Sequence, residues 1–90
     1  MSITAIFEIP GMTAAQYDRV IKDLERAGHG RPKARQYHVA SPMPDGWCVV
    51  DVWESEEDLG KFAEVLMPIL VQNGVTPPKP RVLTVHNVIS

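Results

Sequence analysis

Three polar side chains interrupt stretches of sequence that are otherwise apolar and rich in β-branched residues. Asp51 stands inside Trp47 to Glu54, and His38 and His86 stand inside two further strand-like stretches. A carboxylate in such a stretch loses hydration, so it must be paired, or it can accept a proton as a base. An imidazole titrates near neutral pH and can carry a proton away from a phenolic hydroxyl. The pattern predicts proton removal, with Asp51, His38 and His86 as candidate catalytic residues.

A structural role is the alternative for each of these residues. Asp51 would be satisfied by an ion pair or hydrogen bond with Arg35, with Arg81 or with a histidine on a neighbouring strand. Each histidine would be a neutral imidazole whose hydrogen bonds are made in the core. His86 and the asparagine that follows it point to opposite sides of a regular strand, so at most one of them faces a given pocket.

The register of a predicted hairpin decides which of these side chains meet. The connection over 41–46 (SPMPDG) has two prolines and an Asp-Gly pair, which are typical of a turn between antiparallel strands. A turn centred on residues 43 and 44 predicts two opposed pairs, namely His38 with Val49 and Gln36 with Asp51. Both pairs would lie on the face that carries Trp53, because side chains alternate with period two.

Large aromatic and sulfur-containing side chains could line a cleft for a flat, apolar ligand. The candidate substrate-binding residues are Phe7, Tyr17, Trp47, Trp53, Phe62 and Met67. Ordinary core packing accounts for the same side chains, and that alternative stays open.

Several classes of chemistry lack their sequence signature. Three scattered histidines and one cysteine show no ligand spacing for a metal, and Cys48 has no basic neighbour that would activate it as a nucleophile. There is no nucleophile elbow, phosphate loop or dinucleotide fingerprint, so we expect no cofactor. Nine Lys and Arg against eleven Asp and Glu give a net charge of −2, which argues against nucleic-acid binding.

The elements that must position these residues alternate along the chain. We expect, in order, a strand over 3–9, a helix from 13 to about 28, strands over 35–40 and 47–54, a helix from 55 to about 74, and a strand over 81–89. Thr13 and Gln16 form a capping-box pattern at the first helix, and Ser55 caps the second. Pro68 lies inside the second helical pattern, where it predicts a kink or a break.

This order predicts an α+β, ferredoxin-like βαββαβ fold, with two helices on one face of a four-stranded antiparallel sheet. Ninety residues fit a single domain over 1–90. Both faces of the sheet are apolar, because Cys48, Val50 and Val52 alternate with residues that are equally apolar. Two helices cover only one face, so we expect a homodimer through the other.

The single cysteine and the absence of a signal segment or long apolar run favour a cytoplasmic protein that does not enter the membrane.

The stretch from Val49 to Phe62 (VVDVWESEEDLGKF) resembles the strand-then-helix signature of the dimeric α+β barrel superfamily, especially the antibiotic biosynthesis monooxygenase-like domains. The sequence is most similar to a group of small uncharacterised proteins that share FEIPGMT at 7–13, Gly46-Trp, Asp-Val-Trp-Glu-Ser and Val-His-Asn. The resemblance implies a dimeric barrel over nearly the whole chain and a pocket-lining role for Trp53. Superfamily members include cofactor-independent oxygenases of electron-rich aromatic polyketides, haem-degrading enzymes, isomerases, chlorite-dismutase relatives and proteins with no known reaction. The haem-degrading branch uses a histidine of the second helix, which residues 56–72 lack.

Three hypotheses follow for the function. The first is a homodimeric, cofactor-independent monooxygenase-like enzyme, in which Trp53 orients an aromatic or other apolar substrate and Asp51 or a histidine removes a phenolic proton. The second is a non-catalytic module that binds a small apolar molecule and leaves it unchanged. The third is a structural dimer, in which the polar strand residues form an ion-pair network.

Overall fold

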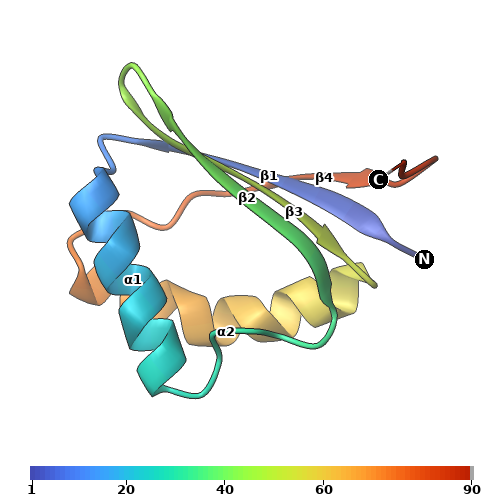
Figure 1. The fold of residues 1–90 in the computed structure, drawn as a ribbon, viewed down its shortest axis with the longest axis horizontal. Coiled ribbons are helices and arrows are strands. Elements are labelled where there is room, and N and C mark those ends of the chain that lie inside the picture. The colour runs from blue at the N-terminus through green and yellow to red at the C-terminus, as the bar shows by residue number, and fades with distance from the viewer. Residues whose placement is uncertain (90) are drawn as a thin grey trace.

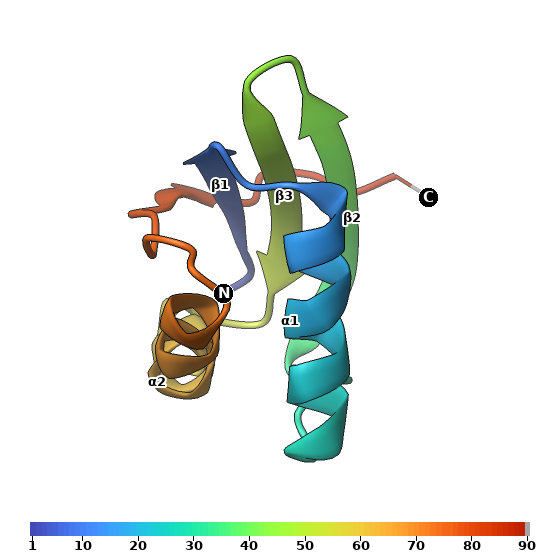
Figure 2. The same cartoon turned by 90° about the vertical axis from the view of Figure 1, so that its left-hand side faces the viewer.

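The chain forms six elements in the predicted order, and the computed structural model describes residues 1–89. They are β1 (Ile3–Pro10), α1 (Ala14–Arg26), β2 (Arg35–Met43), β3 (Gly46–Trp53), α2 (Glu56–Gln72) and β4 (Arg81–Thr84). The strands form one antiparallel sheet in the order β2-β3-β1-β4. Both helices lie on the same side of this sheet (Figure 1), with α1 beneath β2 and β3 and α2 towards β1 (Figure 2). The predicted α+β ferredoxin-like fold is confirmed.

The core lies between the sheet and the helices. Every second residue of β1 is buried, from Ile3 to Ile9, because strand side chains alternate between faces. The same period buries Val49, Asp51 and Trp53 of β3, and Trp53 is only 1 % exposed. The helices contribute Val20 and Leu24 of α1 and Leu59, Phe62, Ile69 and Leu70 of α2. Burying a large apolar side chain stabilises a fold by about 1.5–3 kcal/mol, so this layer is the main source of stability.

Both helices begin at the residues that the sequence predicts. The Thr13 hydroxyl accepts a hydrogen bond from the Gln16 amide, and the Gln16 side chain accepts one from the Thr13 amide, which completes a capping box. The Ser55 hydroxyl accepts from the Asp58 amide at the start of α2. The predicted break at Pro68 is absent, since α2 runs from Glu56 to Gln72 without interruption. Ile69 and Leu70 directly after the proline are buried, and their packing holds this turn in place.

The hairpin register differs from the one predicted. The turn is centred one residue later, on Pro44 and Asp45, so His38 pairs with Asp51 and not with Val49. A shift of the turn by one residue moves each opposed pair by two positions and leaves His38 on its predicted face, whereas a register shift before Tyr37 takes Gln36 off that face. Gly46 fits this turn because a Cβ atom there would collide with the Ile9 carbonyl oxygen of β1.

The last strand is shorter than predicted. β4 ends at Thr84, which pairs with Ile3, the first residue of β1. Among residues 85–89, one further backbone hydrogen bond reaches the sheet, from the Val85 amide to the Ser2 carbonyl. A strand needs a partner along its length, so residues 85–89 leave the sheet. His86 is therefore exposed outside the strand, and its predicted central position is wrong.

The face of the sheet that the helices leave uncovered is apolar. One row across it joins Val39, Val50 and Ile6, and the next joins Tyr37, Val52 and Thr4 to Leu83. At the two edges of the sheet, Val39 is 57 % and Leu83 is 53 % exposed. We call these seven residues the outer sheet face. Within residues 1–89, no helix is both long and apolar enough to cross a membrane.

Candidate functional site

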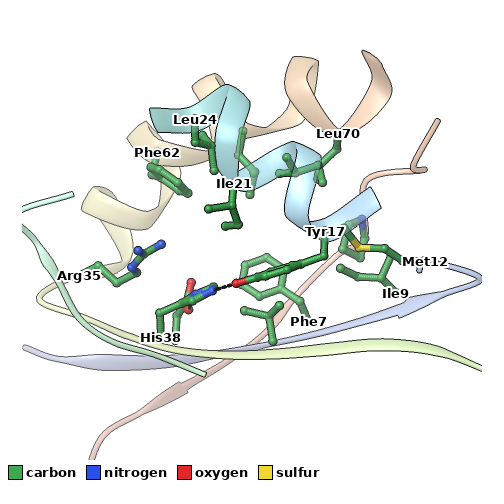
Figure 3. A pocket seen from close by; sticks show the side chains of 15 residues that line it. Phe7, Ile9, Met12, Tyr17, Ile21, Leu24, Arg35, His38, Phe62 and Leu70 are labelled. Carbon is green, nitrogen blue, oxygen red and sulfur yellow. Dashed lines mark hydrogen bonds and ion pairs between the residues drawn. The ribbon is translucent and has the colours of Figure 1, made fainter. Parts of the chain in front are cut away.

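A small cavity lies between the inner face of the sheet and the two helices (Figure 3). Its volume is about 50 Å³. We call it the relay cavity, and its lining is apolar apart from Tyr17, Arg35, His38 and Asp51: the other residues are Phe7, Ile9, Met12, Val20, Ile21, Leu24, Val49, Phe62, Leu66, Leu70 and Pro78. A few polar groups in an apolar cleft are the usual composition of a small-molecule site.

The polar groups at the floor of this cavity form one hydrogen-bonded chain. The Tyr17 Oη atom lies 2.6 Å from His38 Nε2, and His38 Nδ1 lies 2.6 Å from Asp51 Oδ1. The indole Nε1–H of Trp53 donates to Asp51 Oδ2 at 3.2 Å. Figure 3 shows the phenol of Tyr17 reaching down from α1 to the imidazole of His38 on the sheet. We call Tyr17, His38 and Asp51 the proton relay.

The direction of each hydrogen bond follows from the chemistry of the groups. A carboxylate only accepts, so His38 Nδ1 carries a hydrogen and donates it to Asp51. A neutral imidazole then has its lone pair on Nε2, which accepts from the Tyr17 hydroxyl. Asp51 is 4 % exposed, and each of its carboxylate oxygens accepts one hydrogen bond. The carboxylate thereby fixes the tautomer and orientation of the imidazole, as an acidic residue does behind a general base.

Tyr17 is held in place by packing on both sides. Its ring stacks on Trp47 with centroids 5.3 Å apart, and it is nearly parallel to the ring of His38 at 6.1 Å. The capping residue Gln16 donates to the Asn73 carbonyl at the end of α2, which ties the start of α1 to the second helix. The phenol is therefore positioned by contacts from the sheet and from both helices.

The environment of Tyr17 favours its neutral form. Burial raises the pKa of the Tyr17 phenol above its usual 10.0, the Arg35 cation opposes this rise, and the Asp51 and Asp18 carboxylates add to it. A neutral phenol has the hydrogen that the bond to His38 requires.

A pH titration tests this environment. In a Tyr37→Phe variant Tyr17 is the only tyrosine, and we expect its tyrosinate absorbance to rise with a midpoint above pH 10.0. The folded chain holds this proton more tightly than the unfolded chain does. The stabilisation from Tyr17 is therefore full below pH 10.0 and is lost as the pH rises through its folded pKa. A midpoint at or below 10.0 in the folded variant would contradict the buried, hydrogen-bonded phenol.

A β-bulge brings Arg35 to the cavity. Regular alternation from His38 predicts Gln36 on the inner face, but the register shifts between Arg35 and Tyr37, and Arg35 pairs with Trp53. An extra residue in one strand re-aims the side chains beside it. The Arg35 guanidinium projects into the cavity (Figure 3), with its central carbon 5.9 Å from the centre of the Phe62 ring. The sequence did not predict this cation as a site residue, because nothing in its local pattern marks the bulge.

The structure brings together five of the nine predicted site residues around the relay cavity. They are Asp51, His38, Phe7, Tyr17 and Phe62. Trp53 shares their face but does not line the cavity: it packs on Phe62 with ring centroids 5.1 Å apart and supports Asp51 from within the core.

The other three predicted site residues lie elsewhere. Trp47 packs behind Tyr17, and its indole nitrogen is buried without a hydrogen-bond partner in the part of the chain that the structure describes. Met67 is 47 % exposed and lines a neighbouring cavity of about 40 Å³. His86 is exposed beyond β4 and lines neither of these cavities.

Metal-binding residues do not gather around the cavity. Within residues 1–89, no three His, Cys, Asp or Glu side chains are arranged to hold a metal ion. Cys48 lies on β3 next to the inward-facing Val49, so its side chain is on the outer side of the sheet, away from the proton relay. The polar residues that line the cavity offer hydrogen bonding, proton transfer and the charge of Arg35.

Known structures share this arrangement of elements. No protein-family model matches the chain, and no curated protein matches it by sequence. A candidate antibiotic biosynthesis monooxygenase from Chloroflexus aurantiacus superposes with a TM-score of 0.65 at 13 % identity, over 100 % of this chain and 98 % of that one. A second such protein, from Deinococcus radiodurans, gives 0.62 at 12 % identity, over 100 % and 97 %. SnoaB, a cofactor-independent oxygenase from Streptomyces nogalater, gives 0.61 at 11 % identity, over 98 % and 94 %.

The chain has the antibiotic biosynthesis monooxygenase-like fold. The agreement covers both helices and all four strands, since nearly the full length of each chain is matched. The resemblance seen around Val49 to Phe62 is thus confirmed at the level of the fold. At 11–13 % identity the shared fold does not assign an activity, because the same fold carries unrelated reactions.

Proposed function

We propose that the protein is a cofactor-independent oxygenase that acts on a small aromatic molecule with an acidic hydroxyl group. The observation that carries this proposal is the proton relay at the floor of an apolar cavity, with its two hydrogen bonds of 2.6 Å. The same fold occurs in SnoaB, which is described as a cofactor-independent oxygenase, and this similarity is consistent with the proposal.

The first step is removal of the hydroxyl proton. The substrate hydroxyl donates to Tyr17 Oη, the Tyr17 proton moves to His38 Nε2, and the substrate proton takes its place on Tyr17. His38 becomes an imidazolium that the Asp51 carboxylate stabilises at Nδ1. Arg35 supplies a positive charge beside the substrate anion that forms.

The second step is reaction of this anion with dioxygen. Losing the proton makes the ring electron-rich, and the anion supplies the electrons that dioxygen takes up. Where the reacting carbon beside the ring carries two hydrogens, one oxygen atom becomes its carbonyl oxygen and the other leaves as water with those two hydrogens. One substrate and one dioxygen then give one ketone and one water, and no external reductant is consumed.

The size of the cavity restricts the substrate. A cavity that holds one benzene ring has a volume of roughly 150 Å³, three times the roughly 50 Å³ found here. The neighbouring cavity of about 40 Å³ shares Phe7, Leu66, Leu70 and Pro78 with the relay cavity. Together the two cavities have roughly 90 Å³, still less than a benzene-sized cavity, so we propose a compact substrate whose entry moves the shared side chains Leu66 and Leu70.

Oxygen uptake tests the proposed activity. The purified protein is mixed with a panel of single-ring phenols that carry a benzylic methylene group, in the presence of a metal chelator. We expect uptake that depends on protein concentration, and isotope from labelled dioxygen in the organic product. No uptake above the protein-free rate for any compound would contradict the oxygenase proposal.

A binding function is the second candidate, because the relay cavity is small and almost wholly apolar. Such a site could hold an apolar metabolite without transforming it. A ligand that copurifies or binds, and is recovered unchanged after incubation in air, would favour this function over the oxygenase.

We also propose that two copies of the chain associate through the outer sheet face. This face is mostly apolar, including Val39 at 57 % and Tyr37 at 48 % exposure, with Thr4 on β1 and the adjoining Arg81 on β4 as polar groups. Apolar patches of this kind are rarely left in water, and a two-fold dimer covers the same patch on both copies. The partner chemistry is therefore a second copy of the same surface.

A charge in this face is expected to separate the dimer. Val39→Glu would place a carboxylate in each half of the interface without a partner, and we expect the dissociation constant to rise at least about a hundredfold. Sedimentation velocity over a dilution series measures the change. Lys61→Glu, on the exposed side of α2, is the control and should leave association intact. A wild-type chain that is monomeric at all concentrations would overturn the dimer.

A further inference from the structure

A second hollow adjoins the relay cavity on the side where β2 begins. It has a volume of about 230 Å³ and is lined by Arg31, Pro32, Arg35, Gln36, Tyr37 and His38. We call it the arginine cleft. Arg35 and His38 line both hollows, so a ligand that reaches past these two side chains would occupy both.

The arginine cleft has positive charge without a matching negative charge. Its lining includes two guanidinium groups and no carboxylate. Within residues 1–89, the ion pairs are Arg26 with Asp23, His38 with Asp51 and Lys61 with Glu57, so neither Arg31 nor Arg35 is paired. Arg35 makes one long hydrogen bond, 3.5 Å, to the Gly30 carbonyl. Both cations are therefore available to an anion from outside the chain.

The backbone places Arg35 where a ligand would need it. The bulge in β2 puts Arg35 on the inner face in the position that regular pairing would give to Gln36. Its guanidinium packs near the face of Phe62, which leaves the donors at its edge free to meet a planar acceptor. A guanidinium in this setting suits a carboxylate, because the two groups form parallel hydrogen bonds.

We propose that the ligand of this protein is a small hydroxylated aromatic carboxylate. Its ring and hydroxyl occupy the relay cavity, and its carboxylate binds Arg31 and Arg35 in the arginine cleft. The role of the hydroxyl rests on the function proposed above, whereas the carboxylate site rests on the two arginines alone. Arg35 then has two effects: it fixes the carboxylate, and its charge favours the phenolate.

Ligand binding tests the carboxylate site without any need for turnover. The probes are para- and meta-hydroxybenzoate and their methyl esters, titrated into isotope-labelled protein and followed by amide chemical shifts in NMR. We expect at least one acid to bind about tenfold more tightly than its ester, because a charge-assisted hydrogen bond replaces a neutral contact. The preference should weaken as salt is added, since the cleft is open to solvent.

Substitutions in the cleft identify the groups responsible. Arg31→Gln and Arg35→Gln are each expected to reduce the preference for the acid, and Arg35→Lys should retain part of it. Lys33→Gln removes the same charge from the same loop but lies in neither hollow, so it is the matched control and should keep the full preference. Arg31 is exposed, so its variant tests the site even where a change at Arg35 disturbs the bulge.

Equal binding of acid and ester, binding of neither, or an acid preference that survives both glutamine variants would overturn the carboxylate site. Oxygen uptake with the benzylic phenols of the panel described above separates this result from the proposed function. Acid-selective binding without uptake of oxygen by any phenol would leave the carboxylate site in place and contradict the oxygenase. Oxygen uptake with neutral phenols, without a preference for the acid, would support the oxygenase and overturn the carboxylate site.

Discussion

Replacing His38 by alanine is expected to lower kcat/KM for a phenolic substrate by about 100- to 10,000-fold, the usual contribution of a positioned general base. His38 Nε2 is the only acceptor within 2.6 Å of the Tyr17 hydroxyl among the described residues, so without it the relay has no place for the substrate proton. The measurement is oxygen uptake at substrate concentrations below KM.

Two further variants make this result specific. Tyr17→Phe removes the relay hydroxyl but leaves the imidazole, so a smaller loss than in His38→Ala would indicate that a substrate can reach Nε2 directly. His29→Ala, in the exposed segment after α1, is the matched control and should have wild-type turnover. Turnover by His38→Ala within about twofold of the wild type would remove the histidine from the mechanism and support a structural role.

Asp51→Ala is expected to lower the free energy of unfolding by about 2–6 kcal/mol, because two donors lose their acceptor and each buried unsatisfied donor costs about 1–3 kcal/mol. The substitution leaves His38 Nδ1–H and Trp53 Nε1–H without acceptors, in a part of the core where Trp53 is 1 % exposed. A domain of this size has about 5–15 kcal/mol of stability, so this loss would be a large fraction of the total. Urea denaturation, followed by tryptophan fluorescence, measures the loss.

Asp51→Asn separates the loss of charge from the loss of shape. An amide oxygen can still accept one of the two hydrogen bonds, so we expect this variant to be more stable than Asp51→Ala and to lose most of its turnover. Glu64→Ala, on the exposed side of α2, is the control for removing a carboxylate and should change stability by less than about 0.5 kcal/mol. A loss below about 1 kcal/mol in Asp51→Ala would contradict the buried network.

The fold could be predicted from the sequence because its signals are local. Alternating apolar residues in β1 and the capping pair Thr13 and Gln16 each specify one element, and the proline-rich turn before Gly46 indicates a hairpin, although β2 extends to Met43 where the sequence predicted an end at residue 40. The face that carries Asp51 also follows from period two, and the histidine partner was one of three options that the sequence left open.

The site could be predicted only in part, because its geometry depends on pairing between distant segments. The turn position set His38 opposite Asp51, and the bulge exchanged Gln36 for Arg35 on the inner face. β4 is short because its partner β1 begins at Ile3, which pairs with Thr84. His86 therefore lies outside the sheet. Neither the bulge in β2 nor the early end of β4 has a local sequence signal, because each is determined by the strand that pairs with it.

The three initial hypotheses now differ in what they require of the same residues. An oxygenase needs the proton relay to accept a proton, a binding module needs only the apolar lining of the cavity, and a structural network needs only the bonds of Asp51. Turnover in His38→Ala and stability in Asp51→Ala measure different properties. The pair of results therefore distinguishes catalysis from support of the core.

The proton-removal step can be observed without oxygen chemistry. A chromogenic phenol is bound to the protein under argon, at a pH below the pKa that this phenol has in water, and its absorption spectrum is recorded for the wild type and for His38→Ala. We expect a phenolate spectrum for the phenol bound to the wild type and a neutral phenol spectrum for the phenol bound to the variant. A neutral phenol bound to both proteins would contradict a relay that removes the proton.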